Sequence, residues 1–90
     1  MIIAKVIGNI WATRKDEKLN GFKFLVVKQC NTQTDNQFVA ADMIGAGIGD
    51  TVLITKGSSA RNSLENTNIP IDAVIVGIID SLEVDEGLLK

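Results

Sequence analysis

The sequence predicts a small all-β protein in which five strands form a closed or partly open barrel, with one short helix between the fourth and fifth strands. Five segments have the composition and apolar pattern of strands, and polar or glycine-rich connectors separate them. Only one segment, Gly57 to Glu65, has the character of a helix. Because an open sheet of five strands would expose two edges, closure into a barrel is the favoured arrangement.

The first predicted strand runs from Ile2 to Thr13. Its even positions are all small or apolar, which is the period of two expected when one face of a strand is buried. These positions are Ile2, Ala4, Val6, Gly8, Ile10 and Ala12.

The opposite face of this strand should meet water, yet it is half apolar. It carries Ile3, Ile7 and Trp11, with Lys5 and Asn9 between them. We expect Ile3, Ile7 and Trp11 to form a face that contacts another subunit.

Four further strands follow. Asn20-Gly21, a strong turn signal, ends the polar connector before the second strand and predicts a hairpin. The only proline, Pro70, precedes the fifth strand, where its missing N–H does no harm. Earlier in the chain, the side-chain hydroxyl of Ser58 or Ser59 could cap the short helix between the fourth and fifth strands. The four strands are Phe22 to Gln29, Gln37 to Asp42, Thr51 to Lys56 and Asp72 to Asp80.

The length of 90 residues predicts one domain, 1–90, with a thin core. A fold of this size buries only roughly 60–65% of the surface of its unfolded chain. Apolar residues nevertheless make up 46% of the sequence, which is more than such a core hides comfortably. We therefore expect a homo-oligomer.

The charge and the hydropathy of the sequence limit which partners and which cellular location are expected for the protein. Nine Lys and Arg against eleven Asp and Glu give a net charge of −2, which provides no broad field for attracting nucleic acid. The longest nearly unbroken apolar run, Ala73 to Ile79, is far shorter than the ~20 residues of a membrane helix. Cys30 is the only cysteine, and the apolar stretch after Met1 is too brief for a signal peptide. We expect a cytoplasmic protein with no nucleic-acid or membrane partner.

The residue types of an active site are scarce. Histidine, the commonest general base and metal ligand, is absent. A single thiol near a strand end, such as Cys30, is typical of a packing residue. Four carboxylates fall at predicted strand ends, where they commonly accept hydrogen bonds from turn amides. They are Asp42, Asp50, Asp72 and Asp80. We expect no enzyme activity, no metal and no cofactor.

The spacing of Gly45, Gly47 and Gly49 before Asp50 is similar to that of a phosphate loop. A strand follows this segment, however, where a nucleotide-binding motif would have a long helix. We expect these glycines to permit backbone angles or close approaches that a side chain would block.

A second glycine segment, Gly57-Ser58-Ser59-Ala60-Arg61, could hold an anion at a helix start. The favoured alternative is that Arg61 pairs with a carboxylate or a carbonyl, which can belong to a neighbouring subunit. Gly77, in the middle of the fifth strand, predicts tight packing or a bend of the barrel.

A five-stranded barrel also suggests a second possible function, the binding of single-stranded nucleic acid. Such binding requires a basic groove with aromatic stacking residues. Phe22 and Phe24 share one face of the second strand and could stack bases. With a net negative charge they are better explained as core residues. A nucleic-acid-binding module of the oligonucleotide-binding (OB) type is therefore the alternative function.

Five short motifs form one collinear pattern along the chain. They are Gly8-x-Ile10-x-Ala12-Thr13, Gly21-x-Lys23-Phe24-Leu25-Val26-Val27, Asp42-x-x-Gly45-Ala46-Gly47-x-Gly49-Asp50-x-Val52-Leu53, Gly57-Ser58-Ser59-Ala60-Arg61 and Pro70-Ile71-Asp72-Ala73-x-Ile75-Val76-Gly77-Ile78-Ile79-Asp80. This ordered set closely resembles the bacterial microcompartment vertex family of the EutN/CcmL type. The resemblance spans almost the whole chain, from Met1 to about Ser81, and its specificity lies in the order because each motif alone is weak.

The resemblance implies a barrel of OB-like topology that assembles into a pentamer and caps the vertices of a polyhedral protein shell, beside hexameric shell proteins. Flat hexameric tiles cannot close a polyhedron, whereas a head-to-tail ring of five copies supplies the curvature. The Ser-Ser-Ala-Arg sequence favours a metabolic, enzyme-filled compartment over a carboxysome.

By position, the resemblance also marks a set of signature residues in the two glycine motifs and the fifth strand. We expect Arg61 and the turn from Gly57 to Ser59 to contribute assembly contacts. The signature residues are Gly45, Gly47, Gly49, Asp50, Gly57, Ser58, Ser59, Arg61, Asp72, Gly77 and Asp80.

Overall fold

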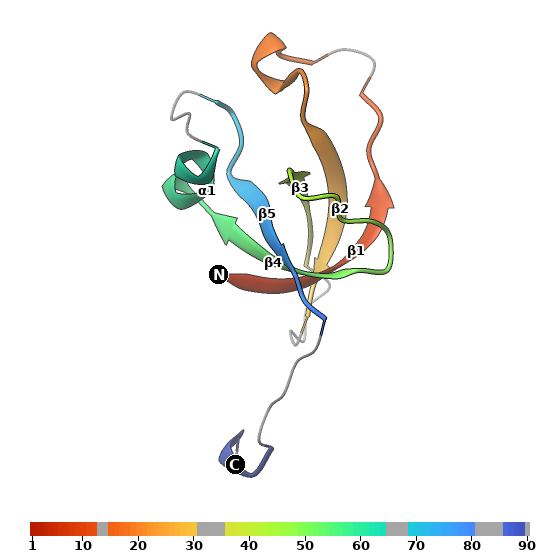
Figure 1. Ribbon diagram of the computed structural model, residues 1–90, viewed down its shortest axis with the longest axis vertical. Helices are drawn as coiled ribbons and strands as arrows, with labels where there is room; N and C mark the ends of the chain where they lie inside the picture. The colour runs from red at the N-terminus through yellow and green to blue at the C-terminus, as the bar shows by residue number, and fades with distance from the viewer. Residues whose placement is uncertain (13–14, 31–35, 65–68, 81–85, 90) are drawn as a thin grey trace.

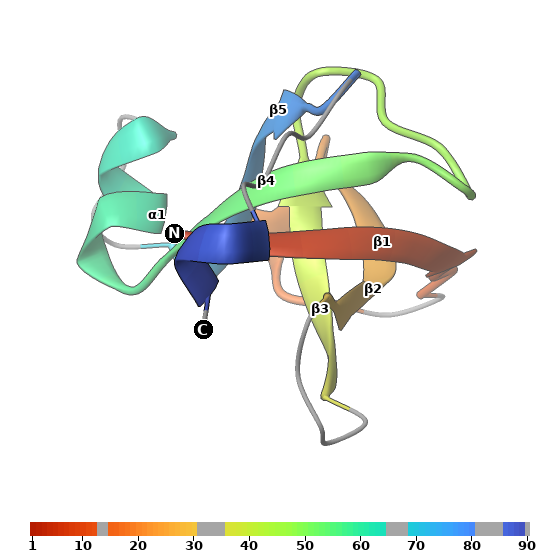
Figure 2. The same ribbon diagram turned by 90° about the horizontal axis from the view of Figure 1, so that it is seen from below.

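The strands of the protein close on themselves. A computed structural model describes residues 1–12, 15–30, 36–64, 69–80 and 86–89. Within them, five strands form a closed barrel in the order β1-β2-β3-β5-β4, and β4 returns to pair with β1, as Figures 1 and 2 show. One α-helix lies between β4 and β5. The predicted five-stranded barrel of OB-like topology is confirmed.

The strand bounds agree closely with the predicted ones except at the first strand. β3 and β4 match the predicted residues, while β2 and β5 are one or two residues shorter at their ends. The elements are β1 (Ile2–Asn9), the 3-10 turn η1 (Glu17–Leu19), β2 (Lys23–Gln29), β3 (Gln37–Asp42), β4 (Thr51–Lys56), α1 (Ser58–Ser63), β5 (Ala73–Ile78) and the 3-10 turn η2 (Glu86–Leu89).

The prediction that the first strand continues to Thr13 was wrong. Val6 pairs with Val27 and Gly8 pairs with Val26, so Ile7 is left as the extra residue of a β-bulge. A bulge reverses the alternation of side chains beyond it and bends the strand. β1 ends at Asn9. Thr13 itself lies outside the described residues.

The same bulge corrects the prediction that Ile3, Ile7 and Trp11 share one strand face. Ile3 lies before the bulge and is half-buried, whereas Ile7 is exposed at the bulge. Trp11 lies beyond the end of β1. The three side chains therefore cannot form a single flat surface.

The interior of the barrel is filled by small and branched apolar side chains from all five strands and from the β3–β4 loop. In β1 and β2 the buried residues alternate with more exposed ones, as expected for strands with one face turned inward. Four alanines among them keep this interior narrow. The buried residues are Ala4, Val6, Leu25, Val27, Ala40, Ala46, Val52, Ile54, Ala73 and Ile75.

A second apolar cluster packs where α1 and the segment before β5 meet β3. It joins Ala60 of α1 to Ala41 and Val74, and Phe22 and Phe24 pack against it. The rings of Phe22 and Phe24 lie 6.4 Å apart, tilted by 46°. Both rings are half-buried and pack against this cluster, which supports their assignment to the core over a base-stacking role.

The helix α1 begins at Gly57, whose φ of 67° is a conformation that glycine adopts without strain. The predicted cap by Ser58 or Ser59 was wrong, because no side chain caps this helix. Instead the Gly57 N–H donates to the carbonyl of Asp72 (2.8 Å), which ties the start of α1 to the residue before β5.

The seam between β3 and β5 is the shortest in the barrel. The two strands run parallel and share only the pairs Ala41 with Val74 and Asp42 with Ile75. On its other side β5 pairs with β4 over a longer stretch, with a register shift that leaves Val76 unpaired next to Gly77. This irregularity agrees with the predicted bend at Gly77. The predicted tight packing is not seen, since an added Cβ would meet only Leu53 at 3.7 Å.

We expect the barrel interior to carry most of the stability of the fold. Leu25 is fully buried, so Leu25→Ala should lower the free energy of unfolding by about 2–5 kcal/mol, because it removes apolar contacts and leaves a cavity. Leu88 is 83% exposed, so Leu88→Ala is the matched control and should change it by less than about 0.5 kcal/mol. Urea denaturation at matched protein concentration measures both. Equal losses would contradict this description of the core.

Candidate assembly surface

The loop between β3 and β4, residues 43–50, is held in one conformation by its glycines and by β1. Gly45 and Gly49 have φ values of 87° and 96°, which only glycine adopts readily. The Gly49 N–H donates to the Val6 carbonyl, and the Val6 N–H donates to the Asp50 carbonyl, each at 2.9 Å. The expectation that these glycines permit special backbone angles is confirmed for Gly45 and Gly49.

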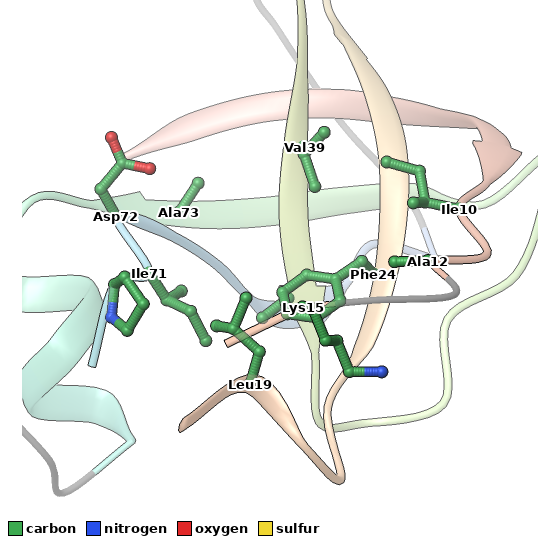
Figure 3. A pocket seen from close by; sticks show the side chains of 11 residues that line it. Ile10, Ala12, Lys15, Leu19, Phe24, Val39, Ile71, Asp72 and Ala73 are labelled. Atoms are coloured by element: carbon green, nitrogen blue, oxygen red, sulfur yellow. The ribbon is translucent and has the colours of Figure 1, made fainter. Parts of the chain in front are cut away.

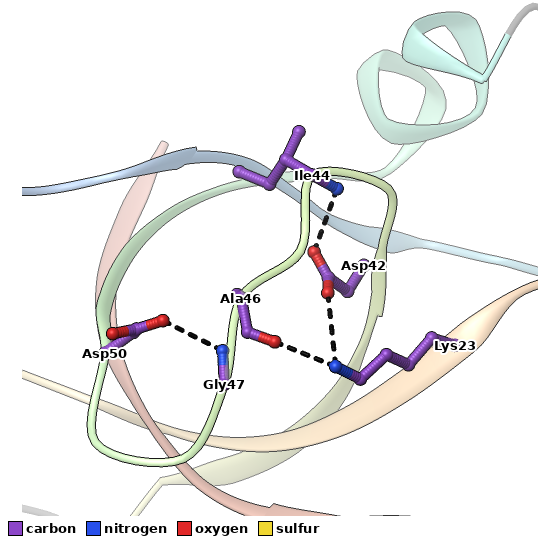
Figure 4. A network of polar contacts seen from close by, with 6 residues as sticks. All are labelled: Lys23, Asp42, Ile44, Ala46, Gly47 and Asp50. Atoms are coloured by element: carbon purple, nitrogen blue, oxygen red, sulfur yellow. Dashed lines mark hydrogen bonds and ion pairs between the residues drawn. The ribbon is translucent and has the colours of Figure 1, made fainter.

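Two predicted turn carboxylates fix the same loop, as Figure 4 shows. Oδ1 of Asp42 accepts a hydrogen bond from the N–H of Ile44 (3.1 Å). Oδ2 of Asp50 accepts one from the N–H of Gly47 (2.8 Å). Both carboxylates therefore do what their positions at strand ends predict.

Lys23 completes this network, and sequence reasoning gave it no role. Its ammonium donates to the carbonyl of Ala46 (2.9 Å) and lies 3.8 Å from Oδ2 of Asp42. The Asp42 side chain is only 1% exposed, and its Oδ2 has no hydrogen-bond partner among the described residues, so the ammonium is its nearby compensating charge. Lys23 and Asp42 are directly paired in the β2–β3 register, a relation visible only once the strands are aligned.

The restrained β3–β4 loop exposes apolar side chains on the surface of the protein. Met43, Ile44 and Ile48 are all exposed, and Ile48 is 62% exposed. Fixing a loop before it binds reduces the entropy lost on association. The loop therefore has the properties of a preformed contact surface.

The second glycine motif lies at the start of α1. Gly57, Ser58 and Ser59 are exposed, and Arg61 is half-buried. In the part of the chain that the structure describes, the Arg61 guanidinium has no ion-pair or hydrogen-bond partner. The expected carboxylate or carbonyl is not supplied by the described residues of the same protomer. The role of Arg61 in assembly stays a prediction.

The remaining predicted residues lie around β5. The backbone carbonyl of Asp72 accepts from Gly57, while its exposed carboxylate has no partner among the described residues. Asp80 is exposed beyond the end of β5. The structure thus joins the Gly57 turn to Asp72.

Between β1 and β2 the chain forms a projecting arm, residues 10–22, of which residues 10–12 and 15–22 are described. It begins with a bond from the Ile10 N–H to the Phe24 carbonyl (3.2 Å). Its far end is closed by η1, which Asp16 caps by accepting from the N–H of Lys18 (2.9 Å). In Figure 1 this arm, in orange, rises above the barrel across from α1.

An apolar groove of about 350 Å³, called here the arm groove, lies between this arm, β3 and the start of β5. Figure 3 shows Leu19, Phe24 and Ile71 at its centre, with the charged groups of Lys15 and Asp72 at opposite ends. The groove was not foreseen, because its walls come from segments far apart in the sequence. They are Ile10, Ala12, Lys15, Leu19, Phe24, Val39, Ala41, Pro70, Ile71, Asp72 and Ala73.

The groups that could perform chemistry do not converge. Among the described residues, no cluster of three or more Cys, Asp or Glu side chains could hold a metal ion. Cys30 is half-buried next to β2, with its N–H donating to the Ile3 carbonyl (2.9 Å). In the described ranges we find no helix that is both long and apolar enough to span a membrane.

Comparison with known proteins places the chain in a family. Residues 1–80 match the family model described as ethanolamine utilisation protein EutN/carboxysome. The chain belongs to the EutN/CcmL family. It is 43% identical to the carboxysome shell vertex protein CcmL of Thermosynechococcus vestitus, over 99% of this chain and 93% of that protein. The family assignment predicted from the motifs is thereby confirmed.

Two solved structures of the family have the same fold. CcmL of Nostoc sp. PCC 7120 superposes with a TM-score of 0.85 at 41% identity, covering 96% of this chain and 94% of that one. GrpN of Rhodospirillum rubrum, described as a pentameric microcompartment shell protein, superposes with a TM-score of 0.84 at 39% identity, covering 94% and 100%. Both carboxysome and other microcompartment proteins are thus similar to this chain, and the compartment type stays a prediction.

We expect the Lys23 ammonium to hold the loop by balancing the buried Asp42 carboxylate. Lys23→Met leaves that carboxylate without a nearby cation and should cost about 1–3 kcal/mol of unfolding free energy. In an Asp42→Asn background the same substitution should cost less, since no buried charge remains. Urea denaturation measures the cycle, and Lys18→Met, on the exposed arm, is the control. Equal costs in both backgrounds would show that the charge pair is unimportant.

Proposed function

We propose that this protein forms a five-membered ring that occupies the vertices of a bacterial microcompartment shell, contacts hexameric shell proteins and has no catalytic activity. The single domain 1–90 would act as one wedge of the ring. Two observations together carry the proposal. The chain has the fold of the EutN/CcmL family, and its restrained 43–50 loop holds apolar side chains exposed on the surface.

The apolar surface supports assembly. Exposed apolar residues lie on the arm, on the 43–50 loop and on β5, where Val76 and Ile78 are exposed. Such exposure is unfavourable in a free monomer and is typical of a subunit interface. GrpN, which shares this fold, is described as pentameric. A cyclic ring of identical wedges is the simplest arrangement that covers surfaces on several sides of one small barrel.

The residue inventory supports a structural role. Histidine is absent from the sequence, and the carboxylates of Asp42 and Asp50 accept hydrogen bonds from backbone amides of their own loop. Carboxylates used in this way fix a loop and are not held ready to transfer protons. We therefore assign the fixed geometry of the loop to assembly.

The mass in solution is the first test of the ring. Size exclusion with light scattering should give a mass of about 49 kDa, five times the 9.7 kDa chain. A monomer that persists across micromolar concentrations would overturn the proposed function. Mixing with a hexameric shell protein then tests the contact at the vertex, because closed shells should form only when both components are present.

Arg61 provides a residue-level test of the second glycine motif. If its guanidinium binds a neighbouring subunit or a shell tile, Arg61→Ala should weaken the ring or its incorporation into closed shells by at least about tenfold. Arg61→Lys should restore only part of this, since an ammonium lacks the planar fork of donors. Lys18→Ala, another surface cation, is the control. Normal ring mass and normal shell closure in Arg61→Ala would exclude this role.

A further inference from the structure

The arm presents one side to its own groove and the other side away from it. Ile10 and Ala12 line the arm groove, while Trp11, between them, does not. Trp11 is 91% exposed, although it is the only tryptophan of the chain and the largest apolar side chain in it. One short segment therefore carries both a wall of an apolar groove and a free apolar side chain that points elsewhere.

The groove has the chemistry of a receptor for an amphipathic aromatic ring. Its walls are apolar apart from Lys15 and Asp72, and its volume of about 350 Å³ is the space of roughly ten water molecules. The Asp72 carboxylate is exposed at one end and has no partner among the described residues. An apolar groove with a free acceptor at one end suits an aromatic side chain that carries one N–H donor.

Trp11 matches this receptor in both respects. Its indole supplies a large apolar area and a single N–H, which usually finds an acceptor when it is buried. Tryptophan is also among the residues most enriched at energetically dominant interface positions. Trp11 does not line the groove of its own chain, so a groove that receives it belongs to another copy.

We propose that Trp11 of one protomer docks into the arm groove of the next, with its indole N–H donating to the partner's Asp72 carboxylate. This inference rests on the proposed ring and names its contact. Because the donor and the receptor lie on opposite sides of one arm, the contact is head-to-tail. A head-to-tail contact repeats around a cyclic axis until the ring closes.

Charge on the two sides favours a second copy as the occupant. The hollow beside Trp11 is lined by Lys23 and by Lys15, which also lines the end of the arm groove away from Asp72, so the donor side carries positive charge. The receptor end carries the Asp72 carboxylate. Opposite charges on the two faces of one molecule favour head-to-tail association and disfavour the symmetric pairing of like faces.

Substitutions at Trp11 test the contact through the ring dissociation constant. Trp11→Ala should weaken the ring by roughly thirtyfold or more, as for a residue that dominates an interface. Trp11→Phe keeps an aromatic side chain but loses the indole N–H and some apolar area, so it should weaken the contact by about two- to tenfold. In an Asp72→Ala background, Trp11→Phe should have a smaller effect, because only the loss of apolar area remains. Leu88→Ala, which removes another highly exposed side chain, is the control and should leave the ring unchanged.

A mixing experiment tests the head-to-tail geometry. Val39 lines the groove and is exposed, so Val39→Glu should block the receptor without disturbing the core. At protein concentrations below the weakened dissociation constant, neither Trp11→Ala nor Val39→Glu should form rings alone. When mixed, they retain one intact donor and one intact groove, and should form a 1:1 dimer of about 19 kDa that cannot close.

The outcomes separate this inference from the proposed function. Rings of normal stability in folded Trp11→Ala, or no dimer in the mixture, would overturn the inference and leave the vertex function standing. A monomeric wild-type protein would overturn the proposed function itself. Far-ultraviolet circular dichroism establishes that each variant is folded, and if Trp11→Ala does not fold, the cycle of Trp11→Phe with Asp72→Ala decides the inference.

Discussion

The return of β4 to pair with β1 is the constraint on which the rest of this structure depends. Antiparallel pairing from Ile2 with Ile54 to Lys5 with Thr51 closes the barrel and leaves no free edge along these strands. A closed barrel of this size has room for a few branched side chains and several alanines. Many apolar residues of a chain that is 46% apolar must therefore lie outside the interior. A second cluster under α1 takes some of them, and the remainder is available for other subunits.

Closure also decides which parts of the outside are rigid. The β3–β4 loop crosses from one strand to the next under three restraints: its glycines, its two carboxylates and the Lys23 ammonium. The Asp42–Lys23 pair is unusual because the carboxylate is buried while the ammonium remains exposed. A buried charge with one exposed partner gains little stability and tolerates few alternative arrangements. Its effect here is to fix the position of exposed side chains such as Ile48, which is what a surface that must match a neighbour requires.

The sequence predicted the elements whose signals are local and missed those that arise from pairing between strands. The bounds of β3 and β4 follow from apolar patterns between polar connectors, and Gly45 and Gly49 follow from the demand of a turn for positive φ. The end of β1 did not follow, because the bulge at Ile7 is visible only in its register with β2. The role of Lys23 and the arm groove likewise depend on which strands lie side by side. The motif order identified the family, but motifs do not show which surfaces meet.

The position of Trp11 links the bulge to assembly. In a regular strand with no bulge at Ile7, Trp11 would continue the alternation of Ile3 and Lys5 on the outer face of the first strand. The bulge reverses that alternation and ends the strand at Asn9, so the chain leaves the sheet and forms an arm. On this arm Ile10 and Ala12 face the groove and Trp11 faces away. In the proposed contact, the bulge thereby separates the donor, Trp11, from the groove of its own chain and leaves that groove to receive another copy.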